Sequence, residues 1–403
     1  SLKFKKRRNE IRTQRIHGTL SDEKKEGTTY QKNIGLTLSK DCGVSCENDE
    51  ALQTDIPDDN LGAYEKFVPP YTPRPECSPL EINEADLSYN IILFDTETNK
   101  MGKDAELCQI AAINQAGDRS FSEYILPNKN IEKHASKVNN LTIRTINGQR
   151  ALFKESNPVQ TLTCDDALTL FVSFIEKSAK EVEKSTSKNV CSVLVGHNAK
   201  RFDVPVLLRN SNSSIITKFQ SLSMCFADTL TLFEYLVKNS ILQDQNGGPC
   251  ALNQSAVYMA LFNQHFNAHD ALEDVKALRR ILFASRLNLS SRDLLNHCKP
   301  ISFNEAYNDN LYLCKRHKLS ETFGSLLYDN SCGKSTISKC MVEKIAGSGL
   351  SYANLKNIFD KFGRKGLVRV LSTSPPGFKK PRVTKTKKIL LAIVRHFEAS
   401  HKQ

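Results

Sequence analysis

The chain has 403 residues, enough for two domains, and its 39% hydrophobic and 25% charged residues are typical of a globular protein. No apolar run reaches the roughly 18 residues that a membrane-spanning helix needs, and the first segment is basic rather than apolar, which argues against a secretory signal. The twelve cysteines form no C-x-x-C pair, so they predict reduced thiols inside a cell rather than a zinc site or a disulfide scaffold.

The net charge of +12 is concentrated at the two ends of the chain. Residues 1–16 carry +6 and residues 376–403 carry +7, which leaves the intervening residues with −1. Basic ends of this kind suit a polyanion such as nucleic acid, although tails that only confer solubility have a similar composition. The C-terminal end supplies six candidate nucleic-acid contacts: Lys379, Lys380, Arg382, Lys385, Lys387 and Lys388.

Alternating and continuous apolar patterns predict regular structure only after residue 87. Residues 1–87 are polar and aperiodic, with a proline-rich stretch, and predict a disordered N-terminal arm and linker. Strands are expected at 89–95, 107–114, 120–126, 190–195 and 224–227, and helices at 165–179, 201–208, 229–238, 251–262 and 270–287. Three meandering strands, followed by helices that alternate with strands, predict an α/β fold with a mixed five-stranded sheet flanked by helices.

Beyond residue 290 the pattern is mainly helical, with helices expected within 319–362 and at 385–398. The sequence therefore predicts three regions: 1–87, 88–290, and a small, basic, mainly helical region over 291–403. Gly347-Ser348-Gly349 resembles the phosphate grip of a helix-hairpin-helix motif, but the polar Ser348 favours an ordinary glycine-rich turn between helices.

Acidic residues stand where two of the predicted strands end. Asp95 and Glu97 close the first strand two residues apart, so their carboxylates share one face. Adjacent carboxylates repel each other unless a cation lies between them, and hard oxygen ligands suit Mg²⁺ or Mn²⁺. An Asp-x-Glu pair is also common at an ordinary strand end. Asp203 follows the strand at 190–195 and would enter the same sheet edge from the start of a helix.

A histidine and a further acid surround the expected start of the helix at 270–287. Asp270 and Glu273 predict an N-cap and a capping box. His269 then stands at N′ and Asp274 at N4, two positions that the entrance of a helix brings together. Taken singly, His269 is typical of a surface residue and Asp274 of a charge on a helix face.

In this order the residues resemble the DEDDh family of 3′–5′ exonucleases, which are DnaQ-like proteins with a ribonuclease-H-like fold. The resemblance covers residues 88–290, and within the family it is greatest to the three-prime repair exonucleases and to the exonuclease domain of promyelocytic leukaemia-like proteins. The matching residues are Asp95 and Glu97 in Phe-Asp-Thr-Glu-Thr, Asp203 in Gly-His-Asn-x-x-x-Phe-Asp, and His269 with Asp274 in His-x₄-Asp.

The resemblance implies a role for each of these residues. The four acids Asp95, Glu97, Asp203 and Asp274 would hold two Mg²⁺ or Mn²⁺ ions about 4 Å apart around the scissile phosphate. His269 would act as general base on the attacking water, because histidine titrates near neutral pH. The resemblance also implies four substrate-binding residues: Thr96, Thr98, Met101 and Asn198. Lys100 replaces a customary glycine beside Met101.

The implied activity is metal-dependent hydrolysis from single-stranded 3′ ends that releases nucleoside 5′-monophosphates, with DNA expected in preference to RNA. The alternatives are a nucleic-acid-binding or assembly module that no longer cuts and a proofreading subunit of a polymerase. Four clustered carboxylates favour the active enzyme, because binding alone does not need them. An intracellular, nuclear location is expected in preference to the cytoplasm, with no membrane partner, and the oligomeric state stays open, a dimer included.

Overall fold

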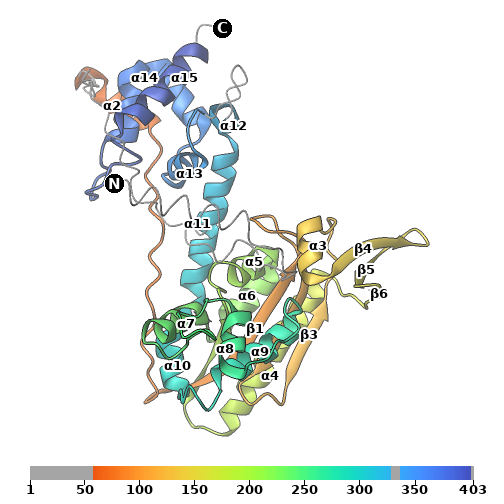
Figure 1. Cartoon of the computed structure of the whole chain (residues 1–403). Helices are drawn as coiled ribbons and strands as arrows, with labels where there is room; N and C mark the ends of the chain where they lie inside the picture. The colour runs from red at the N-terminus through yellow and green to blue at the C-terminus, as the bar shows by residue number, and fades with distance from the viewer. Residues whose placement is uncertain (1–57, 328–335, 401–403) are drawn as a thin grey trace. The chain divides into compact units, whose positions relative to one another are not determined.

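The computed structural model describes residues 58–327 and 336–400, and its central element is a six-stranded mixed sheet (Figure 1). The strand order is β3-β2-β1-β7-β8-β9. The strands are β1 (Leu87–Thr98), β2 (Leu107–Asn114), β3 (Ser120–Tyr124), β7 (Asn189–Gly196), β8 (Met224–Asp228) and β9 (Ile301–Ser302). β1 pairs antiparallel with β2 and parallel with β7, so β1 and β7 end at the same edge of the sheet.

The predicted α/β class with a mixed sheet is confirmed, but the predicted number of five strands is wrong. The two-residue strand β9 adds a sixth by pairing antiparallel with β8. Such a short strand leaves no periodic pattern in a sequence. Ile301 of β9 and Phe303 are buried in the hydrophobic core of the sheet, so this core includes residues beyond position 290.

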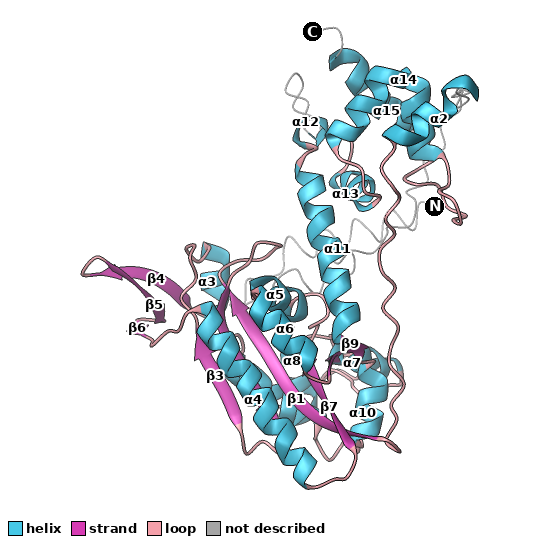
Figure 2. Cartoon of the chain, turned by 180° about the vertical axis from the view of Figure 1, so that it is seen from behind, coloured by secondary structure: helices cyan, strands magenta, loops and turns pink. Residues whose placement is uncertain are grey.

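Side chains of β1 alternate between two hydrophobic cores, one on each face of the sheet. Helices cover both faces (Figure 2). Ile91 and Leu93 belong to the first core, and Ile92 and Phe94 belong to the second. The first core is covered by α7 (Thr229–Lys238), α8 (Gln254–Phe262), α9 (Ala271–Leu282) and α10 (Ser291–Cys298), and the second by α4 (Cys164–Lys184), α5 (Asp203–Asn210), α6 (Ser213–Ser221) and the start of α11 (Phe303–Glu321). Odd-numbered residues of β1 therefore face α9, and even-numbered residues face α5.

A second sheet, absent from the predicted elements, follows helix α3 (Lys133–Asn139) and projects beside it in Figure 1. Its strands are β4 (Leu141–Ile146), β5 (Gln149–Lys154) and β6 (Asn157–Pro158). The turn between β4 and β5 is Asn147-Gly148, with φ of 50° and 80°. A two-residue loop with positive φ at both positions matches the right-handed twist of the strands, and Asn-Gly is the pair that adopts it most readily.

The C-terminal region is mainly helical, as predicted. After α11 it contains α12 (Gly324–Leu327), α13 (Lys339–Gly347), α14 (Tyr352–Ser372) and α15 (Lys387–Ser400). Gly347-Ser348-Gly349 is the turn between α13 and α14, and the Ser348 hydroxyl is buried and donates to the Ile345 carbonyl at 2.7 Å. This inward hydroxyl supports the ordinary glycine-rich turn.

The core of the C-terminal helices includes one residue from far upstream. Tyr64 of α2 (Asp58–Phe67) is buried among them, and its hydroxyl donates to the Gly366 carbonyl at 3.3 Å. The prediction of a disordered arm over 1–87 is therefore wrong for α2, and residues 1–57 lie outside the described residues. In the part of the chain that the structure describes, no helix combines the length and the apolar character needed to cross a membrane.

Candidate nuclease active site

Three carboxylates converge where β1 ends. Oxygen atoms of Asp95, Glu97 and Asp274 all lie within 4.8 Å of one another. Asp95 and Glu97 are odd-numbered residues of β1, so their side chains face α9, which packs on β1 and carries Asp274 in its first turn. The register between β1 and β2 shifts between Glu97 and Thr98, an irregularity of the kind that often accompanies functional sites.

Asp203 belongs to the same edge but approaches it from the other face of the sheet. It is the first residue of α5 and is buried, and its Oδ1 accepts hydrogen bonds from the Thr96 backbone N–H (3.1 Å) and the Thr96 hydroxyl (2.6 Å). Thr96 is even-numbered, so its side chain lies on the α5 side of β1. The two hydrogen bonds with Thr96 hold Asp203 beside Asp95. The Asp203 carboxylate is not one of the three that lie within 4.8 Å of one another.

The entrance of α9 places His269 next to Asp274, as the five-residue offset predicts. The His269 backbone N–H donates to Asp274 Oδ2 at 2.8 Å. His269 has φ of 68°, a left-handed conformation that is uncommon for residues other than glycine and is found more often at functional sites. Asp270 is the N-cap, accepting from the backbone N–H groups of Leu272 and Glu273.

The capping-box prediction is wrong, because the Glu273 side chain pairs with Lys276 (2.9 Å) instead of returning to the cap. The N-cap itself is confirmed by Asp270. Only the reciprocal half of the motif is absent.

Burial and mutual repulsion raise the pKa values of the acids in this cluster. The pKa of Asp95 lies well above its usual value through burial and the nearby Asp203 and Asp274, and that of Glu97 through burial and Asp274. Burial also raises the pKa of Asp203 to about 7, although its bonds with Thr96 oppose this shift. Such a cluster stores repulsion that a bound cation would relieve.

Several residues that the sequence analysis missed support the entrance of α9. Asp270 Oδ2 lies 3.1 Å from Lys154 Nζ of β5 and accepts from the Tyr124 hydroxyl of β3 at 3.2 Å. The Asn139 side chain donates to the Thr98 carbonyl at 3.2 Å and also bonds to Glu97. These contacts join segments far apart in the chain, so local patterns could not indicate them, apart from the Asn-Gly turn that predicts the hairpin carrying Lys154.

The four predicted substrate residues occupy different environments. Thr96 and Thr98 are buried, and the Thr98 hydroxyl donates to the Lys100 carbonyl at 2.8 Å. Met101 is 46% exposed in the loop after β1. Asn198 is buried in a left-handed conformation (φ 57°), and its backbone N–H donates to Asp228 Oδ1 at 2.8 Å. Their substrate contacts stay predictions.

His197, the histidine of the Gly-His-Asn motif, is packed in the interior of the domain. His197 is stacked on Phe233 with ring centroids 4.8 Å apart, and its Nδ1 lies 2.9 Å from the Thr229 hydroxyl. Burial lowers the pKa of His197 to about 3, so the ring is neutral at physiological pH. His269 is therefore the better candidate for the general base.

The basic C-terminal segment keeps five of its six candidate nucleic-acid contacts on the surface. The exposed residues are Lys379, Lys380, Lys385, Lys387 and Lys388. Arg382 does not fit the prediction of a surface contact, because it is 8% exposed and its guanidinium donates to the Ser348 carbonyl at 2.8 Å. Arg382 thus fastens the turn between α13 and α14, and composition alone could not distinguish it from its exposed neighbours.

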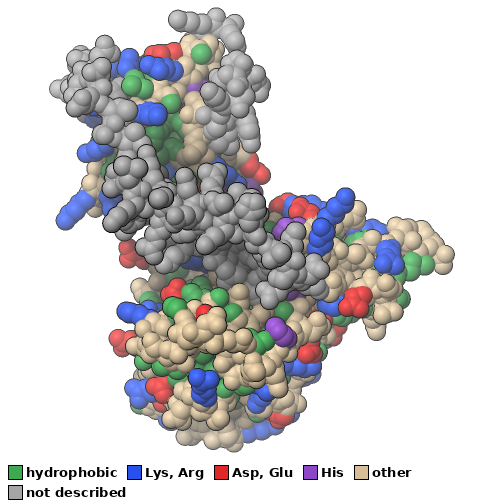
Figure 3. All heavy atoms as spheres, in the orientation of Figure 1, with side chains coloured by type: hydrophobic (Ala, Val, Ile, Leu, Met, Phe, Trp, Pro, Cys, Tyr) green, Lys and Arg blue, Asp and Glu red, His purple; other side chains and the backbone are tan. Residues whose placement is uncertain are grey.

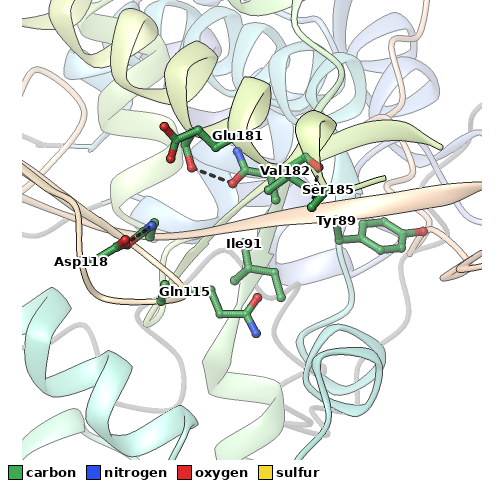
Figure 4. A pocket seen from close by; sticks show the side chains of 11 residues that line it. Tyr89, Ile91, Gln115, Asp118, Glu181, Val182 and Ser185 are labelled. Carbon is green, nitrogen blue, oxygen red and sulfur yellow. Dashed lines mark hydrogen bonds between the residues drawn. The ribbon is translucent and has the colours of Figure 1, made fainter. Parts of the chain in front are cut away.

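A separate hollow of about 440 Å³ lies toward the other end of β1 (Figure 4). Tyr89 and Ile91 of β1, Gln115 and Asp118 of the β2–β3 turn, and Glu181 of α4 contribute to its lining. None of these residues belongs to the carboxylate cluster that the described part of the chain contains. The hollow is therefore distinct from the candidate metal site.

The donor set fits a divalent metal ion. Asp95, Glu97 and Asp274 offer hard oxygen ligands close enough to share one ion, and Asp203 stands beside them. The raised pKa values of Asp95, Glu97 and Asp203 are consistent with a cluster that a bound cation would stabilise.

We expect the metal-free protein to lose stability as the pH rises. The pKa of Asp203 is about 7 in the folded state and about 3.8 in the unfolded state, so between about pH 4 and 7 the folded state binds more protons. The free energy of unfolding therefore falls with rising pH in this interval. Melting temperatures in EDTA should decrease from about pH 5 to 8, and Asp203→Asn should flatten the decrease.

Asp118→Asn is the matched control, because Asp118 is an exposed acid whose hydrogen bond with Asn114 lowers its pKa. It should not flatten the curve. Excess Mg²⁺ should also restore stability at the higher pH by binding only the folded state. A wild-type curve that is parallel to that of Asp203→Asn would contradict the expectation.

Comparisons with known proteins match two parts of the chain. Residues 89–245 match the family model of the Exuperantia RNAse H-like domain, and residues 332–400 match that of the PML C-terminal domain. No curated protein sequence matches the chain.

Two solved structures illustrate the structural similarity. Zinc-bound E. coli exonuclease I in complex with single-stranded DNA has 16% identity and a TM-score of 0.36, covering 60% of this chain and 45% of that one. A 3′-exonuclease that recognises the histone mRNA stem-loop has 13% identity and a TM-score of 0.32, covering 54% and 68%. The chain thus spans less than half the length of the exonuclease I that it matches.

The family-model match and the fold agree with the motifs. The match over 89–245 includes β1, β7 and the start of α5, which carry Asp95, Glu97 and Asp203. The mixed sheet joins these elements at one edge, where α9 adds Asp274. Residues 89–245 of this chain are therefore similar to a ribonuclease-H-like domain, in agreement with the mixed sheet.

Proposed function

We propose that the protein is a metal-dependent 3′–5′ exonuclease that hydrolyses phosphodiester bonds at single-stranded 3′ ends and releases nucleoside 5′-monophosphates. DNA is the preferred substrate in this proposal. The observation that carries it is the convergence of Asp95, Glu97 and Asp274 within 4.8 Å at the edge of a ribonuclease-H-like sheet. A nuclear location is proposed on the basic cluster of residues 3–8, which lies outside the described residues.

Each residue of the site has a distinct task in this proposal. Asp95, Glu97, Asp203 and Asp274 would hold two divalent ions, Mg²⁺ or Mn²⁺. Such ions polarise the scissile phosphate and lower the pKa of a bound water. His269 accepts the proton of the attacking water, and the bond from its backbone N–H to Asp274 keeps it beside the carboxylates.

A strand-shortening assay tests the function directly. A single strand labelled at its 5′ end should shorten one nucleotide at a time with Mg²⁺ or Mn²⁺ and remain intact in EDTA. The same strand labelled at its 3′ end should release the label first as a mononucleotide, and a blocked 3′ terminus should resist. A parallel RNA strand tests how the site treats a 2′-hydroxyl. Cleavage that starts at the 5′ end or internally would overturn the proposed polarity.

Binding without cleavage is the outcome that would favour the alternative, a nucleic-acid-binding or assembly module on a nuclease fold. The buried position of Asp203, outside the group of three carboxylates, is the observation most compatible with that alternative. The same assay therefore distinguishes the two functions, provided that strand binding is measured in parallel.

We expect the basic residues at and just before the start of α15 to strengthen binding to long strands. Lys385, Lys387 and Lys388 are exposed, whereas Leu390 and Phe397 of α15 are buried in the helical core. Replacing the three lysines with glutamine therefore removes charge without removing the core. If all three contact phosphates, the slope of log affinity against log salt should become shallower by about 2 on single strands.

Lys177, Lys180 and Lys184 of α4 give a matched control, since they are three exposed lysines on one helix. Their replacement with glutamine should leave the slope unchanged. Turnover of a very short oligonucleotide should be the same in both variants. Equal slopes in the wild type and the Lys385, Lys387 and Lys388 variant would show that this segment is not a phosphate contact.

A further inference from the structure

We infer that helix α3 and the β4–β5 hairpin form a nucleic-acid-binding arm, defined here as residues 129–154, which holds the phosphate backbone upstream of the 3′-terminal nucleotide. The inference rests on the proposed exonuclease function, because it supplies a path for the strand whose end reaches the acids. It concerns a surface that is separate from the basic C-terminal segment.

Charge is the first observation that supports the arm. The arm contains six basic residues and one acid, whereas residues 17–375 as a whole carry a net charge of −1. The basic residues are Lys129, Lys133, Lys137, Arg144, Arg150 and Lys154, and the acid is Glu132. Figure 3 shows basic side chains along this projection on the right of the molecule. The arm is therefore a local positive feature of a nearly neutral body.

Most of this charge has no carboxylate partner among the described residues. Lys129 pairs with Asp104 (3.5 Å) and Lys154 pairs with Asp270 (3.1 Å). The other four basic residues form no ion pair with any residue in 58–327 or 336–400. Arg144 and Arg150 donate hydrogen bonds to neutral oxygen atoms and keep their positive charge. Guanidinium groups without a carboxylate partner are well suited to phosphate, which they can bind through two parallel hydrogen bonds.

The base of the arm is fixed to the candidate active site. Lys154, at the end of β5, contacts Asp270 at the entrance of α9, and Asn139, at the end of α3, donates to the Thr98 carbonyl of β1. Leu141 and Leu152 are buried together against Cys108 of β2. Polar and apolar contacts thus hold the two ends of the hairpin next to the residues that carry the carboxylates, and a strand on the arm would be directed toward them.

The outer part of the hairpin has the length and the side chains to follow a strand. Six residue pairs run from its base to its tip, a span of about 17 Å at about 3.3 Å per residue. The Arg144 guanidinium lies 4.5 Å from the centre of the Phe153 ring, a contact that restricts its position. Ile146 is 45% exposed on the same face, where it offers apolar surface to a base. The arm therefore combines charge and apolar contact.

The test measures binding of a fluorescent 20-nucleotide single strand to the full chain in an Asp95→Asn background, which prevents degradation. We expect Arg144→Gln with Arg150→Gln to make the salt slope shallower by about 1.4, because about 0.7 is lost per single-strand phosphate contact. Near 0.1 M salt the dissociation constant should rise about tenfold or more. A four-nucleotide strand should show a smaller change, because it cannot occupy both the site and the arm.

Two further variants make the result specific. Arg150 donates to the Asn128 carbonyl at 2.6 Å, and its replacement also removes this bond. Lys133→Gln with Lys137→Gln is therefore a second variant, which removes two charges and leaves the hairpin bonds intact. Arg119→Gln with Lys188→Gln is the control, since these residues precede β3 and β7, away from the carboxylate edge. Slopes that are unchanged in both arm variants, or equally reduced in the control, would overturn the arm.

The arm and the exonuclease proposal can fail separately. If the wild type cuts strands and the arm variants bind normally, the arm is wrong and the exonuclease stands. If the arm variants lose affinity but the wild type never cuts, the arm stands as a binding surface and the exonuclease proposal fails.

Discussion

Asp95→Asn should abolish strand cleavage and at the same time raise the melting temperature of the metal-free protein. Asp95 lies at the centre of the acidic cluster, where burial and the charges of Asp203 and Asp274 raise its pKa. Replacing it with the neutral, nearly isosteric Asn removes repulsion when no cation is present. It also removes a ligand, and metal ions supply several kcal/mol of transition-state stabilisation, so turnover should fall by about 10³-fold or more.

The two effects have opposite signs, and this separates a metal ligand from a structural residue. A variant that is damaged in its fold should melt earlier with and without metal. The expected variant melts later in EDTA, and Mg²⁺ should raise its melting temperature less than it raises that of the wild type. Asp118→Asn, on the exposed β2–β3 turn, should change neither property. Turnover close to the wild-type value would exclude Asp95 as a metal ligand.

Local spacing was enough to predict the parts of the site that depend on one element. Asp95 and Glu97 share a face because side chains alternate along a strand, and both belong to the cluster. His269 and Asp274 meet because positions N′ and N4 adjoin at a helix entrance. These relations need no knowledge of the rest of the fold.

Relations between distant elements could not be predicted in the same way. The bond from Thr96 to Asp203 depends on α5 packing on the opposite face of β1 from α9, which no local pattern encodes. The contact of Lys154 with Asp270 depends on where the hairpin folds back. The hairpin itself was predictable, because Asn147-Gly148 is a strong turn signal between two alternating segments.

The bounds of strands and helices were likewise predictable where a local pattern defines them and not where pairing with a distant segment does. The strand Leu107–Asn114 and the helix Thr229–Lys238 have the predicted bounds, because each carries a clear apolar pattern over its whole length. The strand Ile301–Ser302 is too short for any pattern and is defined only by pairing with β8. Arg382 shows the corresponding limit for surfaces, since a basic run does not reveal which of its members points inward.

The second large effect is expected at His269, where the choice of substitution matters. His269 has φ of 68°, and a left-handed backbone costs most residues about 1–2 kcal/mol, whereas asparagine adopts it readily. His269→Asn therefore preserves the backbone, and the N–H bond to Asp274, better than His269→Ala does. Asparagine cannot accept the proton of a water at neutral pH, so both variants lack a general base. His265→Asn, an exposed histidine four residues earlier, is the control.

We expect His269→Asn to lower the turnover rate by about 10²–10⁴-fold, the usual contribution of a general base. The increase in melting temperature that Mg²⁺ produces should be retained, because the imidazole is not one of the proposed ligands. The wild-type rate should fall toward acid pH because protonation removes the general base. His269→Asn should lack this part of the pH dependence. An acid limb that is identical in the variant and the wild type would assign the proton transfer to another group, and a loss of the Mg²⁺ effect would show that the substitution disturbs Asp274 instead.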